Sequence, residues 1–211
     1  MGLFISTRAA YASTWMTTGK GGVPQDSNQE PSDEVLMQRF GAGESGAFDR
    51  LYARHRGPVY RFFLRQCVDA GVAEELSQDT WMKLIDARAS YRVKARFCTW
   101  LYRIARNNAV DHFRRLSRSV EDHLEFDSQN TPTAGATRET EAPDSRVELH
   151  RQLRQLHNLV AALPAAQREV FLLKEEAGLE ISDIASVLQE NPETVKSRLR
   201  YAMQKLREGL T

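Results

Sequence analysis

The sequence predicts an all-α protein in which two small helical domains are joined by a flexible acidic linker. Apolar residues recur at helical spacing through residues 32–116 and again through residues 147–211, and no segment sustains the alternation of a half-buried strand. Residues 117–146 mix proline, glycine, serine, threonine and acidic residues, a composition typical of a linker. Residues 1–31 are rich in glycine, serine, threonine and glutamine and are predicted to form a disordered leader.

The composition excludes several classes of protein. Only two cysteines occur, Cys67 and Cys98, without a C-x-x-C pair or a Cys/His cluster at zinc spacing, so we expect no disulfide framework, no metal and no cofactor. Both lie in apolar helical contexts, which favours buried small side chains over a redox switch. No apolar run is long enough to span a membrane, and the N-terminus makes a poor signal peptide, so we expect a cytoplasmic protein.

The net charge of +1 conceals two opposed blocks. Residues 88–118 carry nine Lys or Arg against one acid, a net charge of +8, whereas residues 119–149 carry eight acids against two Arg, a net charge of −6. Such asymmetry indicates a nucleic-acid partner better than the overall balance does.

The first block begins with three predicted helices. Ser32 can cap a short helix that ends near Phe40, and a second helix begins near Ser45. The pair Gly57-Pro58 is expected to bend or break this second helix. Asp69 can cap the third helix, which has the sequence AGVAEELSQDTWMKLIDA.

The third helix has two distinct faces when its residues are projected at 100° per residue. One face is apolar and is expected to be buried: Leu76, Thr80, Trp81 and Leu84. The other face carries Glu75, Gln78, Asp79 and Met82. This second face is either the solvated back of a core helix or, because a methionine lies among carboxylates, a contact surface for another protein.

The basic segment FCTWLYRIARNNAVDHFRR, residues 97–115, also divides into two parts. A wide arc is expected to face the core: Phe97, Leu101, Tyr102, Ile104, Ala105, Ala109 and Phe113. A separate strip carries Trp100, Arg103, Asn107 and Arg114. An exposed tryptophan beside arginine and asparagine suits stacking on an unpaired base, worth about 1–3 kcal/mol per base, while the arginines bind phosphates.

A short basic loop, SYRVKARF, precedes this segment. Its candidate nucleic-acid contacts are Tyr91, Arg92, Lys94 and Arg96, and aromatic side chains between basic ones could hold a base flipped from a duplex. The alternative is an ordinary basic connection in which Tyr91 packs inward.

The C-terminal block has the residue pattern of a helix-turn-helix unit. The segment ISDIASVL is the first helix, QEN is the turn, and Asn191 with Pro192 begins the second helix in a favoured pairing. The candidate base-reading residues of that helix are Thr194, Lys196, Ser197, Arg198, Arg200 and Tyr201. An ordinary surface helix is the alternative, and the small net charge of this block predicts weak intrinsic affinity for DNA.

Four segments, taken in order, resemble bacterial RNA polymerase sigma factors of the extracytoplasmic-function type. They are AFDRLYARHRGPVYRFF, AEELSQDTWMKL, FCTWLYRIARNNAVDHFRR and LPAAQREVFLLKEEAGLEISDIASVLQENPETVKSRLRYAMQKLRE. The resemblance implies a region-2-like domain over residues 32–116 and a region-4-like domain over residues 147–211. It also places Gln189 where glycine is usual, so a positive φ there would strain the backbone by about 1 kcal/mol.

The resemblance gives each candidate set a role. The Glu75–Met82 face would dock on the clamp helices of the largest polymerase subunit, and residues 91–115 would capture the unpaired −10 strand. The last helix would read the −35 element, and the acidic linker would follow the RNA exit path. An anti-sigma factor spanning the membrane would hold the protein inactive until an envelope or other stress releases it.

Three functions compete at this point. The first is a transcription initiation factor that binds core RNA polymerase and promoter DNA, with no catalysis of its own and no small-molecule substrate. The second is a free-standing regulator that binds duplex operator DNA through residues 147–211. The third is an enzyme acting on nucleic acid, which we set aside because the nearest acid–base pair, Asp111-His112, lies in a basic helix without further catalytic groups.

Overall fold

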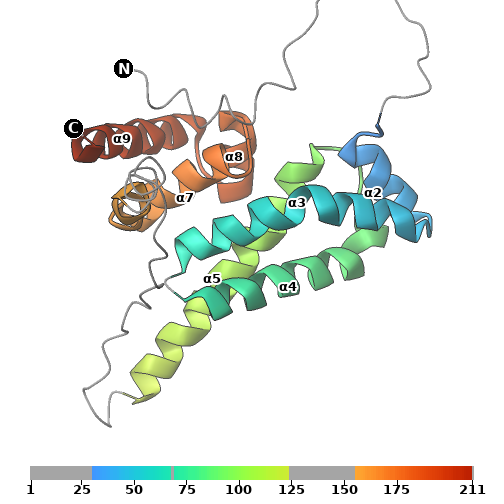
Figure 1. Cartoon of the computed structure of the whole chain (residues 1–211), viewed down its shortest axis with the longest axis horizontal. Coiled ribbons are helices and arrows are strands. Elements are labelled where there is room, and N and C mark those ends of the chain that lie inside the picture. Colours follow the sequence, from blue (N-terminus) through green and yellow to red (C-terminus); the bar gives the residue numbers. More distant parts are fainter. Residues whose placement is uncertain (1–29, 68, 124–154, 211) are drawn as a thin grey trace, which may run out of the picture. The chain divides into compact units, whose positions relative to one another are not determined.

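The structure is a computed structural model that describes residues 30–67, 69–123 and 155–210 (Figure 1). Within these ranges the chain is helical and contains no strand, which confirms the predicted all-α class. Residues 1–29 of the predicted leader and residues 124–146 of the predicted linker lie outside the described ranges. None of the helices in the described part of the chain is long and apolar enough to cross a membrane.

Helices α2 (Asp33–Gly41) and α3 (Ser45–Gln66) follow the predicted bounds closely. The Ser32 hydroxyl accepts the Val35 N–H at 3.4 Å and caps α2, as predicted. Of the predicted bend or break at Gly57-Pro58, the break was wrong, because α3 continues through Pro58 to Gln66. Buried apolar residues on both sides of the proline, among them Leu51 and Phe62, hold the helix together despite the lost hydrogen bond.

Helices α4 (Ala70–Asp86) and α5 (Phe97–His123) are joined by the short 3₁₀ helix η1 (Ala87–Ser90) and a loop. Asp69 caps α4 as predicted, accepting the Val72 N–H at 2.9 Å. Helix α5 runs past residue 116, where the predicted linker begins. Figure 1 shows that α3 and α4 lie side by side, and that the last turns of α5 extend beyond them.

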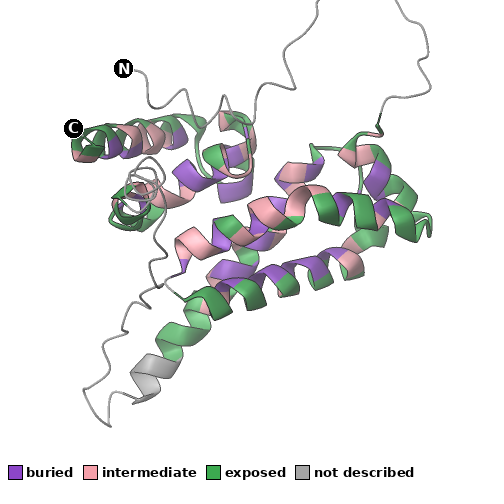
Figure 2. Cartoon of the chain, in the orientation of Figure 1, coloured by how far each residue is buried: buried purple, intermediate pink, exposed green. Residues whose placement is uncertain are grey.

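The inner faces of α2–α5 are buried, as Figure 2 shows, and their side chains belong to the hydrophobic core. The apolar faces predicted for α4 and α5 are confirmed except at two positions of α5. Ile104 is only half-buried. Phe113 is 40% exposed because α5 extends beyond the helices that cover its earlier turns. The principal members of this core are Leu36, Met37, Leu51, Val59, Phe62, Phe63, Leu76, Trp81, Leu84, Phe97, Leu101, Tyr102, Ala105 and Ala109.

The second described block comprises a helical segment over residues 155–161 and helices α7 (Ala165–Glu175), α8 (Ile181–Leu188) and α9 (Pro192–Leu210). The predicted turn is confirmed, since Asn191 Oδ1 accepts the Glu193 N–H at 2.8 Å and Pro192 is the first residue of α9. Gln189 adopts the left-handed region at φ 57° and ψ 42°, so the predicted strain applies. The core here is mainly aliphatic: Val160, Val170, Leu172, Leu173, Leu179, Ile184, Val187, Leu188, Val195 and Leu206.

Candidate nucleic-acid and protein interfaces

The outer face of α4 presents the four residues singled out for protein docking. Glu75, Gln78 and Met82 are exposed and Asp79 is half-buried, while the opposite face of the helix is buried. Met82 is 58% exposed, which is unusual for a long apolar side chain. A flexible thioether surrounded by acidic groups forms a small apolar contact point in a polar rim, an arrangement that suits a protein interface.

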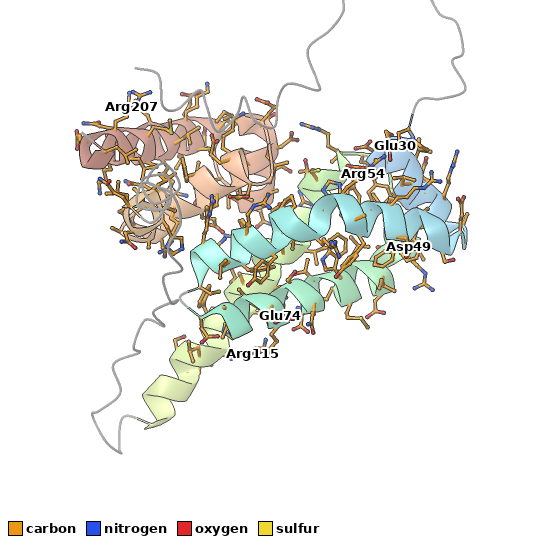
Figure 3. All side chains as sticks on the ribbon, viewed as in Figure 1. Glu30, Asp49, Arg54, Glu74, Arg115 and Arg207 are labelled. Atoms are coloured by element: carbon orange, nitrogen blue, oxygen red, sulfur yellow. The ribbon has the colours of Figure 1, made fainter. Side chains whose placement is uncertain are left out.

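A groove between α3 and α4 extends this face onto α3. It encloses about 450 Å³ and is lined by Tyr52, Arg56, Gly57, Tyr60, Glu74, Ser77 and Gln78. Figure 3 shows Glu74 on α4. The Arg56 guanidinium lies 5.9 Å from the centroid of the Tyr52 ring. The three α3 side chains were not among the predicted site residues, although their four-residue spacing places them on one side of a helix and could have identified them.

The loop before α5 exposes its basic residues but not its tyrosine. Arg92, Lys94 and Arg96 are exposed, as a nucleic-acid contact requires. The prediction that Tyr91 meets DNA was wrong: the residue is only 7% exposed and its ring lies 5.0 Å from that of Trp100. Burial, followed by the nearby carboxylates of α2, raises the pKa of Tyr91 to about 12. Tyr91 therefore supports the loop from beneath, which was the alternative interpretation of this segment.

The exposed apolar residue of this loop is Val93, which sequence analysis missed. Val93 is 53% exposed at the loop tip, and it borders a recess of about 390 Å³. Arg88 and Arg92 also line the recess, although Arg92 donates to the Ala89 carbonyl at 2.9 Å. A concave site with an apolar edge and two guanidinium groups can accept a planar anionic ligand such as a nucleotide.

The predicted strip of α5 is only partly exposed. Arg103, Asn107 and Arg114 are exposed, whereas Trp100 is half-buried and packs against the core. The expectation of a fully exposed tryptophan was wrong, because Tyr91 and Phe97 cover part of its ring at 5.0 and 6.3 Å. One part of the indole remains accessible beside the arginines.

Several arginines of the basic segment contact acidic or hydroxyl groups of α7 and α8. Arg103 donates to the Ser186 hydroxyl at 2.8 Å, and Arg96 lies 3.7 Å from the Asp183 carboxylate. Arg106 donates to Glu169 at 3.3 Å. Burial raises the pKa of Glu169, and the attraction of Arg106 offsets only part of that effect.

A buried polar network joins α4 to α5. The Asn108 amide donates to the Leu76 carbonyl at 3.0 Å and to the Thr80 hydroxyl at 3.4 Å, and its oxygen accepts from Lys83 at 2.6 Å. Asn108 has no exposed surface. The network fixes the outer face of α4 relative to the strip of α5, since a buried amide needs its partners. Asn108 was not among the predicted site residues, although projection at 100° per residue places it in the same buried arc as Phe97.

The predicted base-reading residues of α9 do not share one face. Lys196, Arg200 and Tyr201 are exposed, and the Arg200 guanidinium lies 5.1 Å from the centroid of the Tyr201 ring. Lys196 also donates to Glu193 at 2.6 Å. Arg198 projects from another side and donates to Glu190 in the turn at 3.1 Å. The remaining two, Thr194 and Ser197, are half-buried.

Both cysteines are largely enclosed, as expected. Cys67 is buried and Cys98 is half-buried, and burial raises the pKa of each thiol to about 11. Neither thiol is therefore activated as a nucleophile at neutral pH.

Comparison with known proteins gives consistent results for both blocks. Residues 51–119 match the family described as Sigma-70 region 2, and residues 153–206 match Sigma-70, region 4. The chain is 32% identical over 174 residues to RNA polymerase sigma factor CarQ of Myxococcus xanthus, covering 82% of this chain and 95% of that protein. It is 31% identical over 182 residues to the ECF RNA polymerase sigma-E factor of Escherichia coli K12, covering 84% of this chain and 93% of the relative.

A solved structure supports the same fold. The sigma factor RpoE of Bartonella quintana, crystallised in complex with the anti-sigma factor NepR, superposes with a TM-score of 0.61 at 24% identity. The match covers 77% of this chain and 96% of that one.

Proposed function

The chain belongs to the extracytoplasmic-function sigma factors of bacterial RNA polymerase, and on that premise we propose which of its surfaces performs each step of promoter recognition. A protein of this family directs core RNA polymerase to promoters and initiates transcription there. One observation best supports the division of roles: α4 exposes the four candidate residues on its outer face, while Asn108 of the basic helix α5 hydrogen-bonds to its buried side.

The α4 face is assigned to polymerase binding. Glu75, Gln78 and Asp79 supply the polar groups around the exposed side chain of Met82, and the adjacent groove on α3 offers Tyr52 for further contact. An interface gains most from a few buried apolar or aromatic anchors, so Met82 is expected to contribute more than its acidic neighbours.

The basic loop and the strip of α5 are assigned to the −10 element. The exposed Arg92, Lys94 and Arg96 neutralise phosphates, and the recess beside Val93 accepts a base that leaves the duplex. Trp100 offers part of its indole for stacking. Because stacking on an aromatic ring recovers about 1–3 kcal/mol per base, DNA opening can proceed without ATP hydrolysis.

The helix-turn-helix unit is assigned to the −35 element. Lys196, Arg200 and Tyr201 are exposed along α9, in the position from which a recognition helix reads base edges in the major groove. Weak intrinsic affinity is compensated by polymerase, which holds both DNA-binding surfaces on one promoter and raises the effective concentration of the second contact.

Regulation and location follow from the same assignment. We propose that an anti-sigma factor binds this chain and holds it inactive until an envelope or other stress, as the complex of the Bartonella quintana relative suggests. The chain acts in the cytoplasm, where polymerase and DNA are found, and carries no catalytic activity of its own.

Run-off transcription from sheared genomic DNA tests the function. The reactions contain core polymerase with the chain, core polymerase alone, and the chain alone in a gel-shift assay. Discrete transcripts only when both proteins are present support the proposal. A sharp duplex shift by the chain alone, without transcripts, would favour a free-standing regulator instead.

Three substitutions separate the proposed surfaces. Met82→Ala should weaken polymerase binding, Trp100→Ala should abolish promoter opening while polymerase binding persists, and Arg200→Ala should weaken recognition of the −35 element only. Trp100→Phe, which keeps a flat ring, should restore part of the opening. Lys205→Ala serves as the control for Arg200, because Lys205 is exposed on another side of α9. Equal loss of polymerase binding in all three variants would contradict the assignment.

A further inference from the structure

Three side chains of metal-binding type converge where α2, α3 and α5 meet. Asp33, His55 and Cys98 each offer one ligand atom, and these atoms all lie within 4.8 Å of one another. His55 Nε2 and Asp33 Oδ2 are 2.7 Å apart. The cluster is separate from the DNA-binding strip and the α4 face, and the function proposed above gives it no task.

The donor set matches zinc better than other common ions. A thiolate, an imidazole and a carboxylate combine sulfur, nitrogen and oxygen, a mixture that Zn²⁺ accepts and that the oxygen-seeking Mg²⁺ and Ca²⁺ do not. Together the Cys98 thiolate and the Asp33 carboxylate would neutralise a divalent cation. Three protein ligands leave the fourth tetrahedral position for water.

The geometry requires only a small adjustment. Tetrahedral zinc with bonds of about 2.0–2.3 Å places its ligand atoms about 3.3–3.6 Å apart. No separation in the cluster therefore needs to contract by more than about 1.5 Å, and the contact of 2.7 Å between His55 and Asp33 must open by about 0.6 Å. Rotation about side-chain torsions achieves both changes without moving a helix.

The surroundings already hold two of the ligands in place. Asp33 Oδ1 accepts from Arg54 at 2.6 Å, which orients the carboxylate and leaves Oδ2 directed at His55. Figure 3 shows Arg54 projecting from α3 towards α2. Glu34 accepts the Phe97 N–H at 2.8 Å and so fixes the first turn of α5, where Cys98 lies. The His55 ring packs 5.3 Å from that of Phe97.

We propose that Asp33, His55 and Cys98 bind one zinc ion, which ties the start of α5 to α2 and α3. Cys98 lies in the first turn of α5, directly after the basic loop of residues 91–96, so the ion would hold the end of that loop in place. Local sequence spacing did not reveal it, because 22 residues separate Asp33 from His55 and only the fold brings Cys98 beside them. The alternative is a hydrogen-bonded ion cluster that needs no metal.

Metal titration of the full chain tests the proposal. Chain stripped with a chelator is titrated with Zn²⁺ against a chromophoric competitor, and separately with Co²⁺, whose thiolate charge-transfer band reports cysteine coordination. We expect one equivalent of Zn²⁺ per chain with a dissociation constant below about 1 µM, a cobalt–thiolate band, and a melting temperature that rises with Zn²⁺.

The two cysteines provide a matched pair of variants. Cys98→Ser should weaken zinc binding at least about tenfold and abolish the cobalt–thiolate band. Cys67→Ser removes the other thiol, which lies outside the cluster, and should change neither measurement. His55→Gln should weaken binding while keeping the thiolate band, and circular dichroism verifies that each variant is folded.

Two results would overturn the proposal. The first is a wild-type chain that binds no zinc at stoichiometric concentration, which leaves the ion cluster as the complete description. The second is binding that survives unchanged in Cys98→Ser, which would assign the metal to unrelated surface groups. Neither result bears on transcription, because both are measured in the absence of polymerase and DNA.

Discussion

The two helical blocks of this chain contribute different kinds of buried side chain to the hydrophobic core. Helices α2–α5 rely on aromatic rings in edge-on contact, such as Phe62 with Tyr102 at 5.3 Å and Tyr52 with Trp81 at 5.1 Å. Residues 155–210 contain one buried aromatic residue, Phe171, in an otherwise aliphatic core. The buried polar side chains of the described residues all lie in the first block: Ser77, Thr80, Thr99 and Asn108.

The difference follows from what each block must hold in place. Ring contacts and buried hydrogen bonds are directional, so they fix the angle between helices more narrowly than aliphatic packing does. In the proposed function, the first block carries two surfaces on different helices, α4 and α5, whose relative placement matters. The proposal places the contacts of the second block on a single helix, α9, for which aliphatic packing is sufficient.

The largest effect is expected from Phe62→Ala in the aromatic core. Phe62 is fully buried and its ring meets both Phe63 and Tyr102, so its removal should lower the free energy of unfolding by about 3–5 kcal/mol. Urea unfolding followed by circular dichroism measures the change. Leu210→Ala, at a position 39% exposed, should stay within about 0.5 kcal/mol of the wild type. Comparable losses in the two variants would contradict the view that the rings carry this core.

A smaller effect is expected when the polar network of the same block is broken. Asn108→Ala removes the hydrogen bonds that Asn108 donates to the Leu76 carbonyl and the Thr80 hydroxyl and the one it accepts from Lys83, so it should cost about 1–3 kcal/mol. The loss should exceed that of Asn107→Ala, since Asn107 is exposed on the same helix. Thermal unfolding of the two variants in parallel gives the comparison, and equal stability would show that the network is dispensable.

Acid should weaken one contact that is confined to the first block. Burial raises the pKa of Glu34, but hydrogen bonds from the Phe97 N–H, from its own backbone and from Ser32 lower it by more, so the net pKa lies below the ordinary value. The stabilisation is therefore present at neutral pH and disappears as the pH falls through that lowered pKa. Glu34→Gln should therefore lower the free energy of unfolding at pH 7, and its difference from the wild type should shrink as the pH falls through the lowered pKa, which urea unfolding at a series of pH values measures.

The smallest effect, of opposite sign, is expected in the turn of the second block. Gln189→Gly removes the strain of a side chain at φ 57° and should raise the free energy of unfolding by about 0.5–1 kcal/mol. Glu190→Gly is the control, because Glu190 lacks a positive φ and accepts from Arg198, and it should be destabilising. If Gln189→Gly also lowers the free energy of unfolding, the left-handed conformation of Gln189 does not strain the backbone.

The two blocks also differ in how much their sequences predicted. The helix-turn-helix unit was predicted in detail, including Asn191, Pro192 and the bounds of α8, because caps, prolines and turns are local signals. The buried face of α4 was predicted for the same reason, since one helical period determines it.

The loop and strip of the first block depend on contacts between distant residues, which periodicity does not contain. Tyr91 is buried because Phe97 and Trp100 pack over it, and Phe113 is exposed because α5 is longer than the helices beside it. The continuity of α3 through Pro58 likewise reflects packing on both sides of the proline, which outweighs its local tendency to end a helix.

The buried position of Asn108 leaves the exposed face of α5 free to accept substitutions. Its side chain points into the core, so the bond to α4 uses one face of α5 only. Arg103 and Asn107 are exposed on the other side of that helix, and neither contributes to the Asn108 network. On the proposed assignment, substitutions on the exposed face of α5 can change its contacts with DNA while the bonds of Asn108 to α4 stay intact.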